Sequence, residues 1–180
     1  MIEHLLFNHI LYFQSLESTN DFIKSNFSSL ENHTVVLAGY QTNGKGQFER
    51  IWESQPNLNL LFSILFTEDL DPILMNEIIV KSIGETLDHF SIHSWYKEPN
   101  DVYVDDLKIS GVLMETKYTD NRRDFLVIGI GLNINQQYFT VSSATSMALV
   151  LGHAINKQEV FDVFLSIFEI NYRFMMKDDE

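Results

Sequence analysis

The sequence predicts an α+β fold in which a mixed, mainly antiparallel β-sheet is flanked by helices. Short apolar runs rich in strand-forming residues dominate the first two thirds of the chain, and apolar residues at helical spacing dominate its last part. The chain has 180 residues, 45% of them hydrophobic, which suits one globular domain with its own core. It contains no internal repeat and no long linker, so we expect residues 1–180 to form a single domain.

The first expected elements are a strand, a capped helix and a second strand. Residues 10–14 are rich in strand formers. Ser18 has the position of a helix N-cap, and Asp21 three residues later completes a capping-box pattern. The helix should therefore run from Ser18 to about residue 28. Residues 34–40 are apolar and β-branched, which is typical of a buried strand.

A loop, a third strand and a long helix follow. Residues 41–54 are polar and contain glycine, which indicates a loop. Residues 59–66 are almost wholly apolar and predict a buried strand. Pro72 suits the first turn of a helix that extends to about residue 89, and residues 93–96 then predict a short strand.

The last third of the sheet is expected from a hairpin and one buried strand. A turn at residues 99–101 precedes the strand at 102–104, which the turn at Asp105 and Asp106 joins to a strand at 108–117. The polar residues 118–123 then predict another turn.

The chain should end with a buried strand and two helices. Residues 125–130 predict the strand, which leads into the sequence Gly-Ile-Gly-Leu-Asn. The helices are expected at residues 143–151 and 158–175. In the second helix phenylalanine and methionine recur at helical spacing, which indicates a core face.

Composition excludes several classes of function. The chain has no cysteine, which excludes disulfides, cysteine-bound zinc and a thioester intermediate on the protein. A net charge of −13 argues against a protein that follows nucleic-acid phosphates. The sequence shows neither a signal peptide nor an apolar run long enough to span a membrane, so the expected location is the cytoplasm.

The loop at residues 41–52 is the first of three candidate sites. Gly44 and Gly46 allow positive φ angles that turn backbone N–H groups towards an anion. Lys45 and Arg50 add positive charge, and Trp52 offers a flat face for a purine. A flexible surface loop whose tryptophan packs into the core explains the same residues.

The other two candidate sites are short segments at the ends of predicted strands. Lys97 to Asp101 is followed by Lys108-Ile109-Ser110-Gly111, and a partly buried lysine there would need an anionic partner. The alternative is that both lysines are solvated at strand ends. Asn133, which follows Gly129 and Gly131, could contact a phosphate or a metal-bound water; a glycine-rich strand that packs closely on a neighbour is the alternative.

Taken together and in order, these motifs resemble the catalytic domain of biotin–protein ligases. The resemblance spans roughly residues 14–151. The similar segments are Ser18-Thr19-Asn20 (STN), Gln41-Thr42-Asn43-Gly44-Lys45-Gly46 (QTxGRG), Lys97-Glu98-Pro99-Asn100-Asp101 (KWPND), Lys108-Ile109-Ser110-Gly111 with Glu115 (KxxGxLxE), Gly129-Ile130-Gly131-Leu132-Asn133 (GxGxN) and Ala144-Thr145-Ser146-Met147 (ATSL).

The resemblance implies a biotin/lipoate ligase-like fold, related to class II aminoacyl-tRNA synthetases, and two reaction steps. Biotin and Mg·ATP first give biotinyl-5′-AMP and pyrophosphate. A lysine of a biotin carboxyl carrier domain of a carboxylase then takes the biotin and releases AMP. The expected partners are therefore biotin, ATP with Mg²⁺ and the carrier, and the resemblance is compatible with a monomer or a homodimer.

The resemblance also assigns residues to roles. The expected catalytic residues are Lys108, Lys97 and Asp101. The expected biotin-binding residues are Ser18, Thr19, Asn20, Gln41, Gly44, Lys108 and Gly111. The expected ATP- and adenylate-binding residues are Lys45, Gly46, Gln47, Arg50, Trp52, Asn100 and Asn133, with Asn100 and Asn133 also as candidate contacts to Mg²⁺.

Several positions depart from the family pattern. Lys45 replaces the usual first arginine of the loop, which keeps the charge but loses the bidentate guanidinium. Gln47 replaces a second basic residue, Glu49 a glycine and Glu98 a tryptophan. The early position of Ser18 leaves no room for an N-terminal DNA-binding domain, and the C-terminal β-barrel-like domain of many members is not expected. A lipoate-type ligase and a homologue without ligase activity are the alternative functions.

Overall fold

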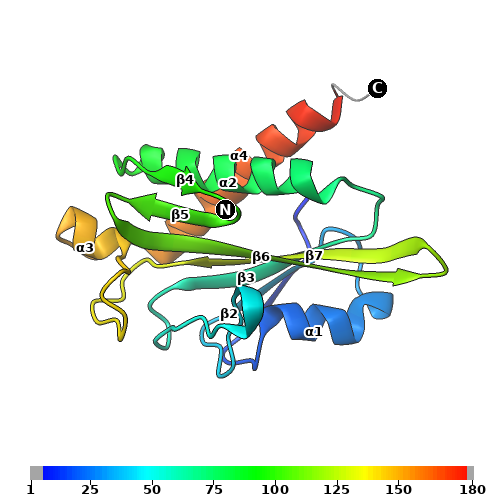
Figure 1. Ribbon diagram of the computed structural model, residues 1–180, viewed down its shortest axis with the longest axis horizontal. Helices are drawn as coiled ribbons and strands as arrows, with labels where there is room; N and C mark the ends of the chain where they lie inside the picture. Colours follow the sequence, from blue (N-terminus) through cyan, green and yellow to red (C-terminus); the bar gives the residue numbers. More distant parts are fainter. Residues whose placement is uncertain (1–5, 178–180) are drawn as a thin grey trace.

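The computed structural model describes residues 6–177 and contains a seven-stranded sheet with helices on both faces (Figure 1). The strands are β1 (Ile10–Phe13), β2 (Val35–Ala38), β3 (Leu60–Phe66), β4 (Trp95–Lys97), β5 (Asp101–Val104), β6 (Leu107–Thr119) and β7 (Arg122–Leu132). Their order across the sheet is β1-β2-β3-β7-β6-β5-β4. β1 and β2 pair in parallel and the other neighbours pair antiparallel, so the predicted mixed, mainly antiparallel sheet is confirmed.

The helices divide between the two faces of the sheet. They are α1 (Thr19–Asn26), α2 (Pro72–His89), α3 (Met147–Leu151) and α4 (Lys157–Lys177), with short 3₁₀ turns η1 (Phe27–Ser29) and η2 (Gln47–Glu49). α2 and α4 pack together on one face, and α1 lies on the other (Figure 1). No helix in the described part of the chain is long and apolar enough to cross a membrane.

The predicted start signals of the first two helices are confirmed. Ser18 caps α1, because its side-chain oxygen accepts a hydrogen bond from the backbone N–H of Asp21 at 3.3 Å. Pro72 occupies the first turn of α2 after Asp71, whose carboxylate accepts from the Ile73 N–H at 2.9 Å. These caps fix the residue at which each helix begins.

Most of the core lies between the sheet and the α2/α4 layer. Phe62 and Phe66 of β3 pack there against Phe164 and Phe168 of α4, all almost fully buried. Each such side chain contributes about 1.5–3 kcal/mol by leaving water. A smaller core of Ile23, Val36, Leu65, Phe125 and Val127 lies beneath α1. Since α1 has only eight residues, part of this second face is left for the loop between β2 and β3.

The β6–β7 hairpin is longer than predicted. The expected turn at residues 118–123 is reduced to Asp120 and Asn121, which have φ angles of 51° and 64°. Asp and Asn tolerate this left-handed conformation, and the strands therefore continue to Thr119 and from Arg122. The hairpin end projects beyond the helices (Figure 1), so its side chains are polar although the backbone is in a strand.

Two further boundaries differ from the prediction. The short edge strand β4 begins at Trp95 rather than at residue 93. The helix expected at 143–151 begins only at Met147, because Ser146 caps it. The residues before the cap instead extend the sheet: Ala144 forms a bridge with Lys108, the Lys108 N–H donates to Ser143 O at 2.8 Å, and the Thr145 N–H donates to Lys108 O at 2.9 Å.

Candidate active site

The floor of the candidate site is a patch of sheet without side chains. Gly111 of β6 pairs directly with Gly131 of β7, and Gly129 lies on the same face two residues away. A Cβ on Gly129 would collide with Asn20 Oδ1, and a Cβ on Gly131 would collide with the Trp52 indole. A Cβ on Gly111 would lie 2.9 Å from Trp52 Cζ3. The glycines therefore let Asn20 and Trp52 lie against the backbone of the sheet.

The roof of the site is the loop between β2 and β3. Its outer part folds back on itself, with the Gly46 N–H donating to Arg50 O at 2.7 Å and the Trp52 N–H donating to Gly44 O at 3.0 Å. Two backbone bonds fix the base of the loop beside α1: the Thr42 N–H donates to Leu16 O and the Asn43 N–H to Glu17 O, each at 2.9 Å.

The positive φ angles expected at Gly44 and Gly46 were wrong. Gly46 has a φ of −116° and Gly44 is not among the positive-φ glycines; within residues 41–54 the left-handed residue is Phe48, with a φ of 54°. A Cβ on Gly44 would lie 2.9 Å from Trp52 O, so Gly44 is required by close packing rather than by backbone conformation. The Gly46 N–H is bonded to Arg50 O within the loop.

Two adjacent cavities meet under the loop. The first has a volume of about 140 Å³ and lies between α1, the loop and the glycine floor. The second has a volume of about 540 Å³ and lies between the loop and the segment that precedes α3. Four residues line both cavities, namely Gln41, Ile51, Trp52 and Lys108. The ring of Trp52 and the side chain of Lys108 therefore stand where the two cavities meet.

Lys108 has two close neighbours at this junction. Its ammonium nitrogen lies 2.6 Å from Asp101 Oδ1 and 5.3 Å from the centre of the Trp52 ring. Its side chain is 29% exposed, so the charge is partly desolvated and needs a nearby anion. Asp101 supplies one, and a cation held between an acidic side chain and an aromatic face is well placed to attract a further anion in either cavity.

Six of the seven residues predicted to bind biotin line the first cavity. They are Ser18, Thr19, Asn20, Gln41, Lys108 and Gly111. Thr19 and Gln41 are joined directly, since the Thr19 N–H and hydroxyl donate to Gln41 Oε1 at 2.7 and 3.1 Å. Gly44 lies elsewhere and lines the second cavity.

The residues predicted to bind the nucleotide divide between the cavities. The first cavity contains Lys45, Gly46, Gln47, Arg50, Trp52 and Asn100 in its lining, and the second contains Trp52 and Asn133. Asn133 is buried and donates to Thr145 O at 3.0 Å, while its Oδ1 has no hydrogen-bond partner among the described residues. Trp52 Nε1 and Ser54 Oγ are also buried and have no hydrogen-bond partner among the described residues, and both residues line the second cavity.

Lys97 is the predicted catalytic residue that the structure does not bring to the site. It is exposed on the edge strand β4 and lines neither cavity. Its ammonium nitrogen lies 4.9 Å from the centre of the Tyr103 ring. Sequence spacing placed Lys97 near Asn100 and Asp101, but the turn at residues 98–100 separates the end of β4 from the cavity.

The two asparagines proposed for Mg²⁺ are not brought into one cavity either. Asn100 lines the first and donates to Val112 O, and Asn133 lines the second. No group of three or more His, Asp or Glu side chains in the described part of the chain could hold a metal ion. A magnesium ion held mainly by protein carboxylates does not fit these residues.

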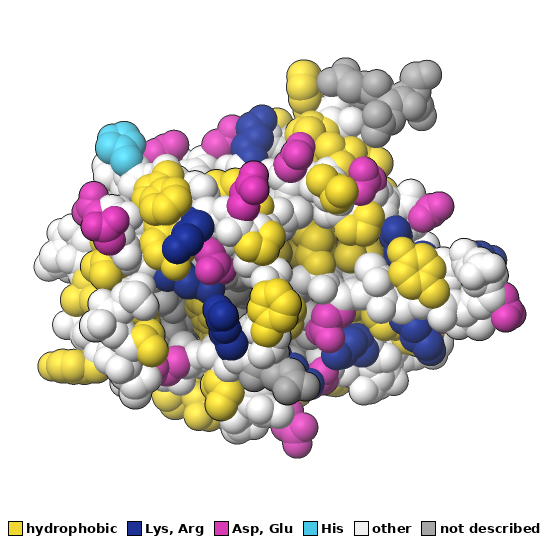
Figure 2. Space-filling view, in the orientation of Figure 1, with side chains coloured by type: hydrophobic (Ala, Val, Ile, Leu, Met, Phe, Trp, Pro, Cys, Tyr) yellow, Lys and Arg dark blue, Asp and Glu magenta, His cyan; other side chains and the backbone are white. Residues whose placement is uncertain are grey.

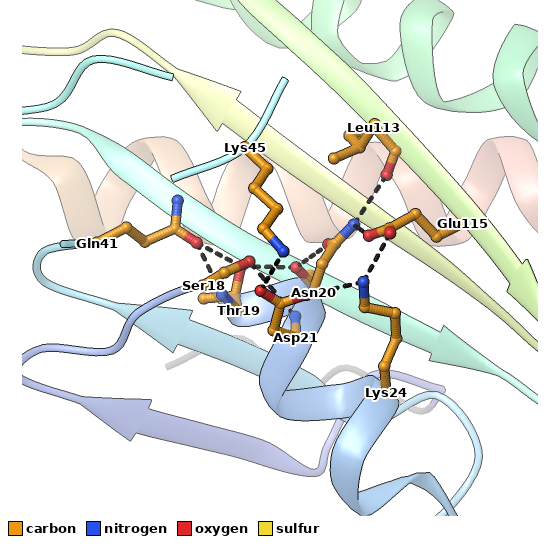
Figure 3. Close-up of polar contacts among 10 residues, drawn as sticks. Ser18, Thr19, Asn20, Asp21, Lys24, Gln41, Lys45, Leu113 and Glu115 are labelled. Atoms are coloured by element: carbon orange, nitrogen blue, oxygen red, sulfur yellow. Dashed lines mark hydrogen bonds and ion pairs between the residues drawn. The ribbon is translucent and has the colours of Figure 1, made fainter. Parts of the chain in front are cut away.

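A network of charged residues beside α1 was not predicted as part of the site. Lys45 Nζ lies 2.6 Å from Asp21 Oδ2, Lys24 Nζ lies 2.7 Å from Asp21 Oδ1, and Lys24 Nζ lies 2.6 Å from Glu115 Oε1 (Figure 3). The capping-box pattern predicted that the Asp21 carboxylate would turn back to Ser18; it contacts the two lysines instead. The i,i+3 spacing of Asp21 and Lys24 was the available sequence indication.

Electrostatics keeps this network charged. Burial raises the pKa of the Asp21 carboxyl, but hydrogen bonds from Lys24 and Lys45 and the charges on both outweigh it and hold that pKa below its ordinary value. Burial lowers the pKa of Lys24, but its contacts with Asp21 and Glu115 outweigh burial and raise that pKa overall. On the face shown in Figure 2, several Lys and Arg side chains lie close together around a hollow, although the chain carries a net charge of −13.

Fold and site together identify the class of protein. The chain belongs to the biotin/lipoate A/B protein ligase family, whose model matches residues 11–133. Among curated proteins, it is 29% identical over 185 aligned residues to the bifunctional ligase/repressor BirA of Bacillus subtilis (strain 168), covering 96% of this chain and 55% of BirA. The chain spans about half the length of such curated relatives.

Solved structures support the same assignment. The biotin protein ligase from Aquifex aeolicus in complex with biotin and ATP superposes with a TM-score of 0.82 at 29% identity, covering 93% of this chain and 71% of that one. The biotin acetyl coenzyme A carboxylase synthetase from Helicobacter pylori with bound biotinylated ATP gives a TM-score of 0.66 at 26% identity, covering 90% and 74%. The predicted resemblance to the catalytic domain of biotin–protein ligases is therefore confirmed, and the chain is a ligase-family protein.

Proposed function

We propose that this chain is an ATP-dependent biotin–protein ligase that activates biotin as biotinyl-5′-AMP and transfers it to a lysine of a biotin carboxyl carrier domain. The position of Lys108 is the observation that carries the proposal. Its ammonium group stands where the two cavities meet, 2.6 Å from Asp101. A carboxylate in one cavity and an α-phosphate in the other would meet at this cation.

The first cavity suits biotin in shape and chemistry. Its floor is the glycine backbone with the apolar Trp52 ring beside it, and Ser18, Thr19 and Gln41 add hydrogen-bonding groups to its lining. A ureido ring has both N–H donors and a carbonyl acceptor, which hydroxyl and amide side chains can match. The volume of about 140 Å³ is below the usual range of ligand pockets, about 300–1,000 Å³, so we expect the loop to move outward when biotin enters.

The second cavity suits the adenylate end of the ligand. Asn133 Oδ1, Ser54 Oγ and Trp52 Nε1 are buried polar atoms without partners among the described residues, and all three residues line this cavity. Unpaired buried polar atoms are costly, and a nucleotide with donors and acceptors would satisfy them. Lys45 and Arg50 line the neighbouring first cavity, from which their charges would attract the phosphates at the junction of the two cavities.

The chemistry then follows from charge. A biotin carboxylate and a triphosphate repel each other, and Lys108 would neutralise both as the carboxylate oxygen attacks the α-phosphorus and pyrophosphate leaves. In the second step a carrier lysine amine attacks the biotinyl carbonyl, and AMP leaves. Asp101 would orient that amine and accept its proton. Since Asp101 also pairs with Lys108, the same carboxylate would serve both steps.

A pyrophosphate-exchange assay tests the proposal. The protein is incubated with ATP and labelled pyrophosphate, with biotin, with lipoate or with neither acid. Exchange that requires biotin is the expected result. Exchange with lipoate alone would assign the chain to the lipoate branch of the family, and absence of exchange with either acid, despite biotin binding, would assign it to a homologue without ligase activity.

A further inference from the structure

Two contacts, on opposite sides, hold the outer part of the loop between β2 and β3. We call residues 41–54 of this segment the covering loop. On one side, the Trp52 ring lies on the glycine floor of the sheet. On the other, Lys45 reaches from the middle of the loop to Asp21 in the first turn of α1, at 2.6 Å (Figure 3). The backbone bonds from Thr42 and Asn43 fix only the base of the loop. Among the described side chains, the Lys45–Asp21 pair therefore joins the outer part of the loop to α1.

Asp21 is itself held in place by the sheet. Its second carboxylate oxygen contacts Lys24, and Lys24 contacts Glu115 of β6. The other oxygen of Glu115 accepts a hydrogen bond from Asn20 Nδ2 at 2.8 Å. Asn20 Oδ1 accepts a hydrogen bond from Ser63 Oγ at 2.6 Å, and Ser63 Oγ lies 2.6 Å from Thr19 Oγ1. Thr19 Oγ1 donates to Oε1 of Gln41, at the start of the loop, at 3.1 Å. These contacts therefore connect Asp21 to two strands, β6 through Glu115 and β3 through Ser63.

We propose that Asp21 is a positioning residue for the covering loop: its carboxylate holds Lys45, and through Lys45 it keeps Trp52 packed over the glycine floor. The carboxylate does not line either cavity, so it acts through Lys45 and not on the ligand. The functional consequence rests on the proposed function, because loop closure would retain the adenylate. The contact by which Asp21 positions the loop is present in the protein without ligand.

The size of the effect follows from exposure. The side chains of Lys45 and Asp21 are 40% and 29% exposed, and an ion pair of this kind shifts an equilibrium by a factor of about two to five. Such a pair can hold a loop closed while still allowing it to open for a ligand. An anion near Lys45 would compete with Asp21 for the same ammonium group.

The test uses Trp52 as a reporter of the loop. The chain has two tryptophans, and replacing the second, which is half exposed on β4, by Trp95→Phe leaves Trp52 as the only one. Acrylamide quenching of its fluorescence is then measured without ligand for the variants Asp21→Asn, Lys45→Met and both together. Either single change should raise the quenching constant about two- to fivefold, and the double change should add nothing further.

Matched controls separate positioning from a general effect on the fold. Lys24→Met removes the link between Asp21 and Glu115 but leaves the contact of Asp21 with Lys45, so quenching should rise less than in Asp21→Asn. Asp21→Glu should restore most of the protection. Added salt should raise quenching in the parent and have little effect in Asp21→Asn, because it screens the ion pair. Circular dichroism confirms that each variant is folded.

Three results would overturn the proposal: unchanged quenching in Asp21→Asn, an equal increase in Lys24→Met, or full additivity of Asp21→Asn and Lys45→Met. None of these measurements requires biotin or ATP. A failure of the pyrophosphate-exchange assay in the parent would therefore count against the proposed function and leave the role of Asp21 to be judged from quenching alone.

Discussion

The ammonium nitrogen of Lys108 lies 2.6 Å from Oδ1 of Asp101, on the neighbouring strand of the sheet. The pair stands at the junction of the two cavities, and the bridge between Lys108 and Ala144 fixes the backbone on its other side. This fixed cation connects the fold to the proposed chemistry.

Lys108→Ala should lower biotin-dependent pyrophosphate exchange by about a hundredfold or more, because it removes a positioned charge from the reacting groups. The fold should persist, since the side chain is partly exposed. Lys117→Ala is the matched control, because Lys117 lies on the same strand but its side chain is 53% exposed and far along the projecting hairpin. Near-normal exchange in Lys108→Ala would remove the assignment.

Lys97→Ala should have a much smaller effect, within about tenfold of the parent, because an exposed charge outside both cavities contributes little. The family motif predicts a catalytic role for Lys97, whereas the structure places it outside both cavities. Exchange rates at several ATP concentrations decide between them. A loss as large as that of Lys108→Ala would show that β4 moves towards the site when ligands bind.

Gly129→Ala should destabilise the protein by about 1–3 kcal/mol, the usual effect of forcing extra atoms into a packed site. The new Cβ would meet Asn20 Oδ1, which is buried and hydrogen-bonded to Ser63. Urea unfolding measures the change. Gly84→Ala, in α2, is the control: its Cβ would meet nothing closer than 3.7 Å, and stability should rise by up to about 1 kcal/mol. Equal stabilities of Gly129→Ala and the parent would contradict the packing argument.

Glu68 should give stability a specific pH dependence. Burial raises the pKa of its carboxyl, but the hydrogen bonds from His33 and the backbone and the charge of His33 outweigh burial and lower that pKa overall. The contribution is therefore fully present above the ordinary pKa of 4.5 and is lost as the pH falls through the lowered value. Unfolding curves of the parent and Glu68→Gln should differ at pH ~7 and converge in strong acid. A difference that does not change with pH would refute this role.

Gln47→Arg should reduce the release of free biotinyl-5′-AMP into solution. Gln47 lines the first cavity, at a position where the resemblance to the family motif predicts a basic residue. A charge added there would stabilise the bound adenylate by up to about 1 kcal/mol, or a factor of about five. Mass spectrometry of the filtrate quantifies the released adenylate in both proteins. Equal release would show that the missing charge at residue 47 is unimportant.

Local patterns predicted much of the fold. The N-cap Ser18, the first-turn proline Pro72 and the apolar run of β3 were sufficient to place those elements, because these signals depend on neighbouring residues alone. The order of the strands depends on contacts between distant segments, which no local pattern encodes. The continuation of β6 and β7 into residues 118–123 was missed because these residues are mainly polar and give no alternation of apolar and polar side chains.

The candidate site was predicted from motifs, with two gaps. Lys97 was assigned by its place in a motif, but the path of the chain from β4 to β5 takes its side chain away from the cavity. Asp21 was interpreted as part of a cap, because its long-range partner Lys45 lies on a loop whose position only the folded chain defines. Both points concern side-chain direction, which spacing along the sequence does not determine, and the catalytic role of Lys97 stays a prediction.

The most direct test of the central claim is the identity of the activated intermediate. The protein is mixed with ATP and an equal concentration of biotin and lipoate, and the acid-quenched products are analysed by mass spectrometry. The expected products are biotinyl-5′-AMP and pyrophosphate, formed by the parent and almost absent in Lys108→Ala. Lipoyl-adenylate in its place, or no adenylate from a protein that binds biotin, would contradict it.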